Sequence, residues 1–350
     1  MLHKTLLIAG GGPRGLACAI EAIGKFSSIY IIDSAPTDSW NSLSTVANFE
    51  LRSPVSFDLV TYSLTKRDWS LSTFLYKEDI FFTTQRDIEK DSRRVNRAEF
   101  YNYICWIKKK LQDNNVQFIY TNLLSIDNST AHTQSGDIKF DYLILALGSK
   151  EKQVPSNLLK YKRIDNKDLI ENEYKSLLII GSGQGAYDIA SYLYNKGVRV
   201  GLYITKDAKI NQYPIPDYSL WKARTALGPY CSTLVSTVSK QRYIDSVKSW
   251  GPSITPNNQH LLLDIPIYKN INVTEIINKY DNRFVSRVGV TPINILNIKQ
   301  TDINRNFRLL DTNIFVSGPL TTLYDGPRSN SIISSSKCAV QIIKEIEEVG

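Results

Sequence analysis

Two glycine-rich segments, each directly after a short apolar run, constrain the fold of this 350-residue chain more than any other feature. They are residues 5–15 (TLLIAGGGPRG) and residues 177–186 (LLIIGSGQGA). An apolar strand, closely spaced glycines and then a helix are typical of the unit that binds dinucleotides. The two segments lie much farther apart than the repeats of a solenoid do, so they indicate two nucleotide-binding units.

The first segment has the spacing G-x-G-x-x-G at Gly10, Gly12 and Gly15. The absent side chains permit a tight turn and a close approach of the backbone to a pyrophosphate, which the helix N-terminus attracts. Residues 29–32 form the next strand, and Asp33 ends it, where a carboxylate accepts hydrogen bonds from both ribose hydroxyls. The order favours dinucleotide binding over a glycine-rich turn without a ligand. The candidate residues are Gly10, Gly12, Pro13, Arg14, Gly15 and Asp33.

The second segment, G-x-G-x-x-A from Gly181 to Ala186, precedes a helical pattern and the strand 198–204. No acid ends that strand, which continues into Thr205 and Lys206. A 2′-phosphate there meets a hydroxyl and a cation, so NADPH is favoured over NADH; the alternative is that Lys206 is only a solvated loop residue. The candidate residues are Gly181, Gly183, Gln184, Gly185, Thr205 and Lys206.

The rest of the chain fits an α/β fold in which the second unit is inserted into the first. Helical spacing over 97–111 is followed by a strand at 116–120, and the continuous apolar strand 140–148 ends at Gly148. Polar residues 149–172 are a plausible crossing to the second unit. A strand at 312–318 and a helix at 331–349 indicate that the chain then returns.

The net charge of +8 does not by itself distinguish nucleic acid, an anionic surface or phosphate-bearing cofactors, and the one lysine triplet, at 108–110, ends a helical pattern. The four cysteines and three histidines are scattered, which predicts a reduced compartment and no metal. The apolar start is too short for a signal peptide, and no apolar stretch is long enough to span a membrane. We therefore expect a cytoplasmic protein that binds neither nucleic acid nor membrane.

Paired glycine motifs, the strand FDYLILALG (140–148) and a late strand ending at Gly318 resemble the two-dinucleotide flavoproteins, which include reductases and class B flavin monooxygenases. The resemblance implies FAD at the first motif and NAD(P)H at the second. It implies domains at 1–165 (FAD), 166–300 (NAD(P)H, inserted) and 301–350 (FAD). It also places Gly148 at the junction between domains and Gly318 near the flavin ribityl chain and pyrophosphate. Pro319 replaces an aspartate common there, so the expected donors are Ser329, Asn330 and Ser331.

A narrower resemblance, to the ornithine and lysine N-hydroxylases, rests on short segments. They are Trp40, DLVT at 58–61, SLSTFL at 70–75, RAEFYNY at 97–103 with Trp106, and GSGQ at 181–184. The resemblance implies that Trp40 and the 58–61 segment lie beside the isoalloxazine.

Two departures from that pattern bear on the substrate. Phe57 stands where these hydroxylases have a lysine that grips the amino-acid carboxylate, so an ornithine-like substrate loses its anchor. Arg52 stands where they have a flavin-facing glutamine, and it either places a cation near the flavin or pairs with a surface carboxylate. The aromatic and proline-rich residues 212–230 either wall an apolar pocket or form ordinary core and turns.

The resemblance implies an NADPH-consuming flavin monooxygenase: hydride reduces FAD, oxygen adds at C4a, and the resulting (hydro)peroxyflavin gives its distal oxygen to a small nucleophile such as an amine. One alternative is an NAD(P)H:acceptor flavin oxidoreductase, and another is a non-catalytic dinucleotide-binding redox sensor. The missing side-chain catalyst is expected when a cofactor carries the chemistry. The expected partners are a small-molecule substrate and O2, and the sequence leaves the oligomeric state open.

The end of the strand 198–204 generates a prediction about coenzyme choice. NADPH is expected to reduce the flavin faster than NADH at subsaturating concentrations, because Thr205 and Lys206 replace the acid that selects NAD. Lys206→Glu is expected to remove or reverse this preference by repelling the 2′-phosphate. Anaerobic flavin reduction followed with each coenzyme measures it. Equal rates with both coenzymes, in the parent and in the variant, contradict the role given to Lys206.

Overall fold

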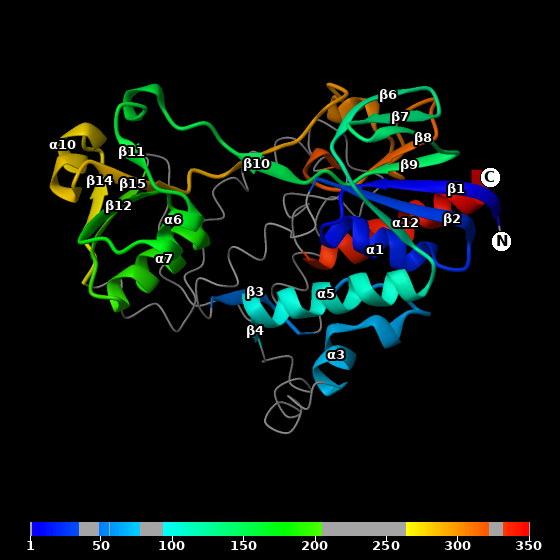
Figure 1. The fold of residues 1–350 in the computed structure, drawn as a ribbon, viewed down its shortest axis with the longest axis horizontal. Helices are drawn as coiled ribbons and strands as arrows, with labels where there is room; N and C mark the ends of the chain where they lie inside the picture. Colours follow the sequence, from blue (N-terminus) through cyan, green and yellow to red (C-terminus); the bar gives the residue numbers. More distant parts are fainter. Residues whose placement is uncertain are drawn as a thin grey trace.

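The computed structural model describes residues 2–34, 49–55, 57–77, 94–204, 264–321 and 332–349. Two five-stranded sheets form the centres of two units that lie side by side (Figure 1). Both ends of the described chain belong to the first unit, and the second unit is built from the middle of the chain. This arrangement confirms the predicted α/β class with one unit inserted in the other.

The sheet of the first unit is parallel throughout, in the order β17-β9-β1-β2-β5. Its strands are β1 (Leu2–Ala9), β2 (Phe26–Asp33), β5 (Gln117–Tyr120), β9 (Tyr142–Leu145) and β17 (Ile314–Val316). Strands β2 and β5 lie on one side of β1 and β9 lies on the other, so the chain changes direction between β1 and β9. In parallel sheets such a switch point is where ligands bind, at the carboxyl ends of the strands.

The central strand β1 is buried on both faces because its side chains alternate between two cores. Leu6 and Ile8 pack with three helices, α1 (Pro13–Ala22), α5 (Arg97–Asp113) and α12 (Ile332–Val349). Leu7 and Ala9 pack toward an antiparallel sheet on the other face. Its strands are β6 (Leu123–Asp127), β7 (Thr130–Thr133) and β8 (Gly136–Lys139). Each fully buried leucine or isoleucine contributes about 1.5 to 3 kcal/mol.

Helix α5 begins where a capping box satisfies its first turn. The Asn96 side chain accepts a hydrogen bond from the Glu99 backbone at 2.8 Å, and the Glu99 carboxylate accepts one from the Asn96 backbone at 3.0 Å. Its buried face confirms the helix predicted for 97–111. Lys110, the last lysine of the triplet in this helix, makes specific contacts, because its Nζ lies 2.6 Å from Asp68 and 4.2 Å from the centre of the Trp69 ring.

The second unit repeats the parallel arrangement, in the order β11-β15-β12-β13-β14. Its elements are β11 (Lys162–Arg163), α6 (Asn166–Glu171), β12 (Ser176–Ile180), α7 (Gln184–Asn195), β13 (Arg199–Ile204), β14 (Ile267–Lys269), α10 (Val273–Ile277), η6 (Asn278–Tyr280) and β15 (Arg283–Ser286). Leu177 and Ile179 face the core shared with α7, whereas Leu178 and Ile180 face the core shared with α10. The switch point of this sheet lies between β12 and β15.

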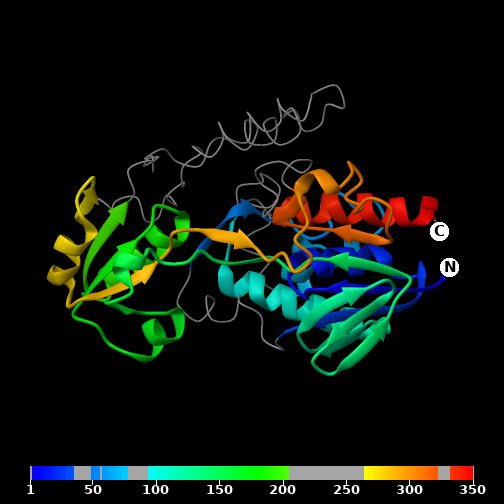
Figure 2. The same ribbon diagram turned by 90° about the horizontal axis from the view of Figure 1, so that it is seen from above.

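Two short strands connect the units. Strand β10 (Ser149–Glu151) pairs antiparallel with β16 (Val290–Pro292), so the chain leaves and returns along one ribbon. Figure 2 shows β16 as the orange arrow between the units. The predicted crossing at 149–172 is therefore too long, because β11 and α6 already belong to the second unit.

A second contact between the units involves a short antiparallel ribbon of β3 (Glu50–Pro54) and β4 (Arg94–Asn96). Phe49, directly before β3, packs in the core of the second unit, with its ring centre 6.0 Å from that of Tyr192 in α7. The Phe49 carbonyl accepts a hydrogen bond of 2.8 Å from the Arg97 backbone.

The remaining short elements are η1 (Arg67–Trp69), α3 (Leu71–Lys77), η2 (Ser156–Leu158), η7 (Gln300–Asp302) and η8 (Pro319–Thr321).

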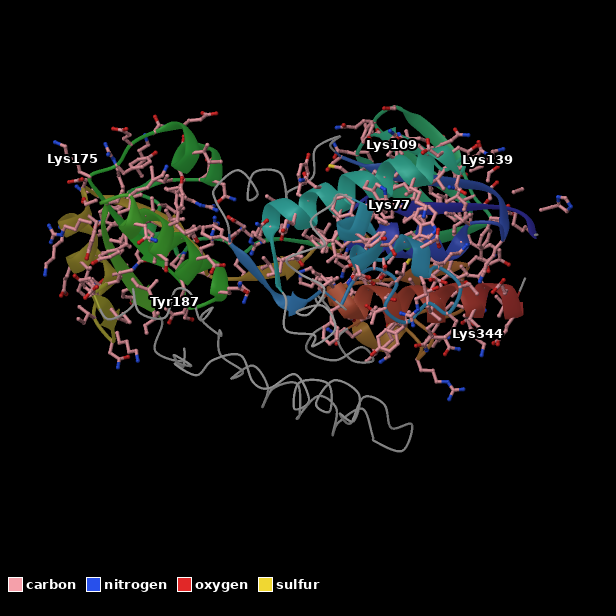
Figure 3. All side chains as sticks on the ribbon, turned by 90° about the horizontal axis from the view of Figure 1, so that it is seen from below. Lys77, Lys109, Lys139, Lys175, Tyr187 and Lys344 are labelled. Carbon is pink, nitrogen blue, oxygen red and sulfur yellow. The ribbon has the colours of Figure 1, made fainter. Side chains whose placement is uncertain are left out.

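The lysines labelled in Figure 3 are spread over both units, with Lys175 on the second unit and Lys77, Lys109, Lys139 and Lys344 on the first.

None of the helices within the described ranges combines the length and apolar character needed to span a membrane.

Candidate functional site

The first glycine loop is fixed by two contacts that leave no room for a side chain. Gly10 has φ +113°, and a Cβ on it would overlap the carbonyl oxygen of Ala146, the first residue after β9. A Cβ on Gly15 would overlap the carbonyl oxygen of Gly10. The fold itself therefore requires these two glycines, one at the turn and one where α1 packs on β1.

Gly12 is different, because nothing in the described part of the fold demands a glycine there. Its backbone, at φ −79° and ψ −178°, is extended, a conformation that any residue adopts. A Cβ on Gly12 would have no atom of the described chain within 4 Å. Gly12 precedes the first turn of α1, whose backbone N–H groups have no intrahelical partners. The open space at this helix N-terminus fits a diphosphate that approaches the backbone closely.

Asp33 reaches the same loop from the end of β2. A Cβ on Gly11 would lie 2.5 Å from Asp33 Oδ2, so the carboxylate lies against the glycine loop. It is half-buried, within reach of a ligand held over α1. The structure thus brings together the glycines and the acid that the sequence predicts as one site.

Arg14 is a buried cation in the first turn of α1, with 8% of its surface exposed. Its guanidinium donates to Ser334 Oγ at 3.0 Å and to Ser317 Oγ at 3.4 Å. Gly318 lies beside the same side chain, because a Cβ on it would lie 3.5 Å from Arg14 Cδ. The dipole of α1 disfavours a cation at the helix N-terminus. An anion bound there is favoured both by the dipole and by the charge of Arg14. Arg14 thus fits a phosphate group.

Sequence reasoning missed Ser317 and Ser334 as partners of Arg14. It expected donors at Ser329, Asn330 and Ser331, which lie outside the described residues. The available signals were the serine directly before Gly318 and the run of serines that opens α12.

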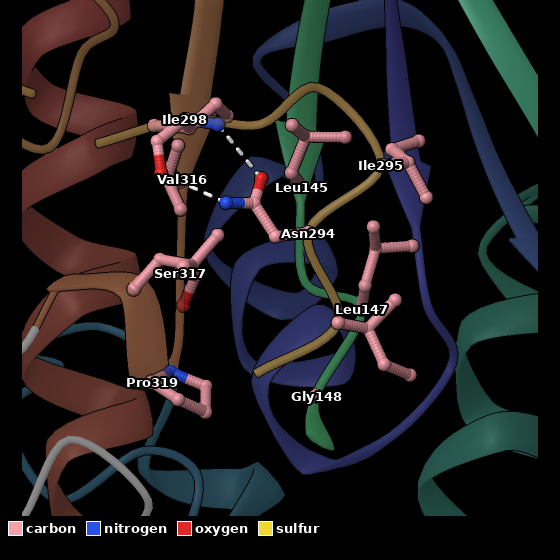
Figure 4. A pocket seen from close by; sticks show the side chains of 11 residues that line it. Leu145, Leu147, Gly148, Asn294, Ile295, Ile298, Val316, Ser317 and Pro319 are labelled. Atoms are coloured by element: carbon pink, nitrogen blue, oxygen red, sulfur yellow. Dashed lines mark hydrogen bonds between the residues drawn. The ribbon is translucent and has the colours of Figure 1, made fainter. Parts of the chain in front are cut away.

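A small pocket lies at the carboxyl ends of β9 and β17 (Figure 4). Gly148 and Pro319 line it, and both were predicted from the sequence as cofactor residues. Its wall is otherwise largely aliphatic, and the Asn294 amide makes two hydrogen bonds, of 2.8 and 2.9 Å, with the Ile298 backbone. The lining residues are Leu145, Leu147, Gly148, Ile293, Asn294, Ile295, Ile298, Val316, Ser317, Pro319 and Leu320.

Three of the segments that carry the narrower resemblance, at 58–61, 70–75 and 97–103, lie close together in the first unit. The Asp58 carboxylate accepts hydrogen bonds of 2.9 Å from the backbones of Val60 and Leu71, which ties the 58–61 turn to the start of α3. The Tyr103 hydroxyl of α5 donates to the Trp69 carbonyl at 2.8 Å. The same turn is joined to α12, because the Tyr62 backbone donates to Ser336 Oγ at 2.8 Å. These hydrogen bonds therefore fasten the turn within the first unit, whose core contains Leu59 and Val60.

Phe57 directly precedes this turn and is buried, with 3% exposed. Arg52 belongs to strand β3. Trp40 and the aromatic segment 212–230 lie outside the described residues, as do Thr205 and Lys206.

The second glycine loop repeats the geometry of the first. Gly181 has φ +144°, and a Cβ on it would overlap the carbonyl oxygen of Arg287, the first residue after β15. Gly183 has an ordinary backbone (φ −82°, ψ 165°), and no atom of the described ranges lies within 4 Å of its Cβ position. Gln184 begins α7, and Gly185 follows it in the first turn. The molecule therefore has two open helix N-termini of the same kind.

Two parallel sheets, each with such a loop at its switch point, define the two-dinucleotide-binding class of α/β proteins. The L-lysine 6-monooxygenase/L-ornithine 5-monooxygenase family matches residues 4–303. The chain belongs to this monooxygenase family, which confirms the resemblance seen in the sequence. No curated protein sequence matches the chain significantly.

Solved structures show the same fold at low sequence identity. The FAD-bound cadaverine monooxygenase of desferrioxamine biosynthesis from Erwinia amylovora has a TM-score of 0.77 at 15% identity, covering 98% of this chain and 94% of its own. The ornithine N-hydroxylase of Kutzneria sp. 744, with reduced FAD, NADP+ and L-ornithine, has a TM-score of 0.77 at 12% identity. The L-lysine 6-monooxygenase of Pseudomonas syringae has a TM-score of 0.74 at 18% identity. The last two matches cover 99% of both chains.

The two open glycines generate a paired prediction. Gly12→Val is expected to yield a folded protein without FAD, because valine fills the space beside the α1 N-terminus. Gly183→Val, its matched control, is expected to keep FAD and to lose NADP+ binding. Flavin absorbance per protein and calorimetric titration with NADP+ measure the two effects. Full flavin occupancy in a well-folded Gly12→Val protein refutes the first assignment.

Asp58 generates a prediction about pH. Burial raises the pKa of its carboxyl to about 6, against the hydrogen bonds that it accepts, whereas an unfolded aspartate titrates at about 4. The folded chain therefore binds this proton more tightly, and the stabilisation is complete below about pH 4 and lost as the pH rises through about 6. Its size is up to about 3 kcal/mol.

Asp58→Asn removes this dependence. In urea unfolding, the free energy of unfolding of the variant, relative to that of the parent, is expected to be higher at about pH 8 than at about pH 5. Parallel pH profiles for the two proteins contradict the raised pKa of Asp58.

Proposed function

We propose that the chain is an FAD-dependent monooxygenase that consumes NADPH and hydroxylates the nitrogen of a small amine. The observation that carries the proposal is the pair of glycines, Gly12 and Gly183, that the fold does not require. Each leaves open the N-terminus of a helix at a sheet switch point, as a bound diphosphate needs. Membership of the monooxygenase family supports the assignment of the chemistry.

The first site is assigned to FAD and the second to NADPH. In the first, Gly12 admits the diphosphate, Arg14 supplies positive charge and Asp33 accepts hydrogen bonds from the ribose. The cofactor residues proposed for it are Gly10, Gly12, Pro13, Arg14, Gly15, Asp33, Trp40, Gly148, Gly318, Pro319, Ser329, Asn330 and Ser331. Those of the NADPH site are Gly181, Gly183, Gln184, Gly185, Thr205 and Lys206. The domains proposed on this basis are 1–165 and 301–350 for FAD and 166–300 for NADPH, except that β11 (Lys162–Arg163) pairs within the second sheet and so belongs with the NADPH domain.

FAD bound at the first site would supply the acceptor for the hydride of NADPH and the activation of O2, from which one oxygen atom would pass to the substrate. The chain's own residues bind and orient: the 58–61 turn, fastened by Asp58 to α3 and by Ser336 to α12, supplies a rigid wall near the first site. Rigidity there excludes water and keeps oxygen transfer coupled to NADPH use. The residues proposed nearest the flavin are Trp40, Arg52 and Phe57.

The proposed substrate is an amine without an amino-acid carboxylate, aromatic or apolar in character. Phe57 supports this, because a buried phenyl ring at the start of the turn offers no charge to a carboxylate. A missing charged hydrogen bond costs about 1.5 to 3 kcal/mol of binding. The fold is shared with a cadaverine monooxygenase, and that substrate is a diamine without a carboxylate. A cytoplasmic location and direct use of O2 belong to the same proposal.

A panel of amines tests the function. Aromatic, apolar and diamine substrates, with free L-ornithine and L-lysine for comparison, are incubated with the FAD-loaded protein, NADPH and O2. Hydroxylated product, peroxide and NADPH consumption are measured together. We expect at least one carboxylate-free amine to give product in near-equal proportion to NADPH consumed.

Other outcomes identify other functions. Fast NADPH oxidation that yields only peroxide, or that reduces an added quinone without product, indicates an oxidoreductase without oxygen insertion. Dinucleotide binding without flavin reduction indicates a redox sensor. Tightly coupled hydroxylation of free ornithine or lysine overturns the substrate proposal and shows that another residue binds the carboxylate.

A further inference from the structure

Arg287 lies at the switch point of the second sheet, outside the glycine motif at 181–186 and outside the segments that carry the family resemblance. It is the first residue after β15, and its backbone N–H donates to the Ile180 carbonyl at 2.7 Å. Ile180 ends β12 and directly precedes Gly181. Arg287 therefore lies beside the second glycine loop, on the side away from β13.

The first unit has a residue in the equivalent place, and it is small. The Ala146 backbone donates to the Ala9 carbonyl at 2.8 Å, and Ala9 precedes Gly10 as Ile180 precedes Gly181. The carbonyl oxygen of Ala146 contacts Gly10 as that of Arg287 contacts Gly181. The two loops thus share one backbone geometry, but the second has a guanidinium where the first has a methyl group.

The Arg287 side chain extends over the loop and is held there. Its Cδ lies 3.8 Å from the Cβ position of Gly185, in the first turn of α7. Its guanidinium donates to Glu151 Oε1 at 2.9 Å, to the Ser286 carbonyl at 3.1 Å and to Asn166 Oδ1. The side chain keeps 16% of its surface exposed, so it remains accessible to a ligand. Glu151, Asn166 and the Ser286 carbonyl fix its orientation.

Two other arginines, Arg163 and Arg97, act on the charge of Arg287, and the carboxylates beside them are Glu151 and, next to Arg97, Asp188. Arg163 shares the same carboxylate, donating to Glu151 Oε2. Burial, and then the positive charges of Arg163 and Arg97, lower the pKa of the Arg287 guanidinium to about 10. An anion beside Arg287 would relieve this repulsion.

We propose that Arg287 binds the diphosphate of the nicotinamide dinucleotide at the second glycine loop, from the side opposite β13. This inference rests on the proposed function of that loop. A guanidinium fixed by three partners keeps its N–H donors in one plane for a phosphate oxygen. Because the switch point is where the diphosphate crosses a parallel sheet, Arg287 contacts a part of the ligand that NADP+ and NAD+ share.

The shared contact gives a sharp test. Arg287→Gln is expected to raise the Kd of NADP+ and that of NAD+ by the same factor, about tenfold or more, because each loses one charge-assisted contact. Calorimetric titration of the oxidised, FAD-loaded protein with each dinucleotide measures the Kd without turnover. Arg287→Lys is expected to recover part of the affinity for both, since it keeps the charge and loses the planar fork.

Arg163→Gln is the matched control, because it removes the other arginine bound to Glu151 and leaves Arg287 in place. Its Kd values are expected to stay within about twofold of the parent. Unchanged flavin content and melting temperature show that each variant is folded.

Three results would overturn the proposal. Unchanged or tighter binding in Arg287→Gln means that the side chain only packs on the loop or obstructs it. Loss of NADP+ affinity alone means that Arg287 contacts the 2′-phosphate. An equal loss in Arg163→Gln means that the ion-pair network, and not Arg287, sets the affinity. If the parent protein binds neither dinucleotide, the proposed function of the loop itself fails.

Discussion

The architecture depends on one backbone contact, made twice. At the end of each central strand, a glycine lies against the carbonyl of the first residue after the neighbouring strand across the switch point. Gly10 makes it with Ala146 and Gly181 with Arg287. Any side chain at either glycine would force the two strands apart. The contact brings each helix N-terminus to the carboxyl edge of its sheet, and the open glycine two residues later then faces the space where a ligand can lie.

The sequence predicted the parts of the site that local spacing determines. In each unit the strand, the glycines, the helix and the next strand follow one another within a few dozen residues. Both glycine loops, and Asp33 beside the first, could therefore be predicted from the sequence. The second strand of each sheet and the closing helix could be placed for the same reason, since their apolar patterns are continuous. The assignment of residues in the segment 205–263 depends on the sequence alone.

What the sequence could not predict comes from segments that meet only in the folded chain. Ser317 and Ser334 reach Arg14 from more than three hundred positions away, and no motif marks them. Arg287 stands after a strand of ordinary composition, and its place beside Gly181 follows from the order of strands in the sheet. The capped turn at Asp58 is similar: its residues resemble those of a family, but their packing against α3, α5 and α12 explains why they occur together.

The ribbon of β10 and β16 has a consequence for the order in which the protein can be completed during synthesis. All strands of the second sheet lie between the two members of this ribbon, whereas β9 receives its outer neighbour β17 only after the inserted unit has been made. The growing chain therefore exposes an unpaired strand edge of the first sheet while the later-encoded unit already has every strand that it needs. Nascent domains fold as their segments become available. The unit made second is thus the first able to close, and the unit that contains the N-terminus waits for its last strand.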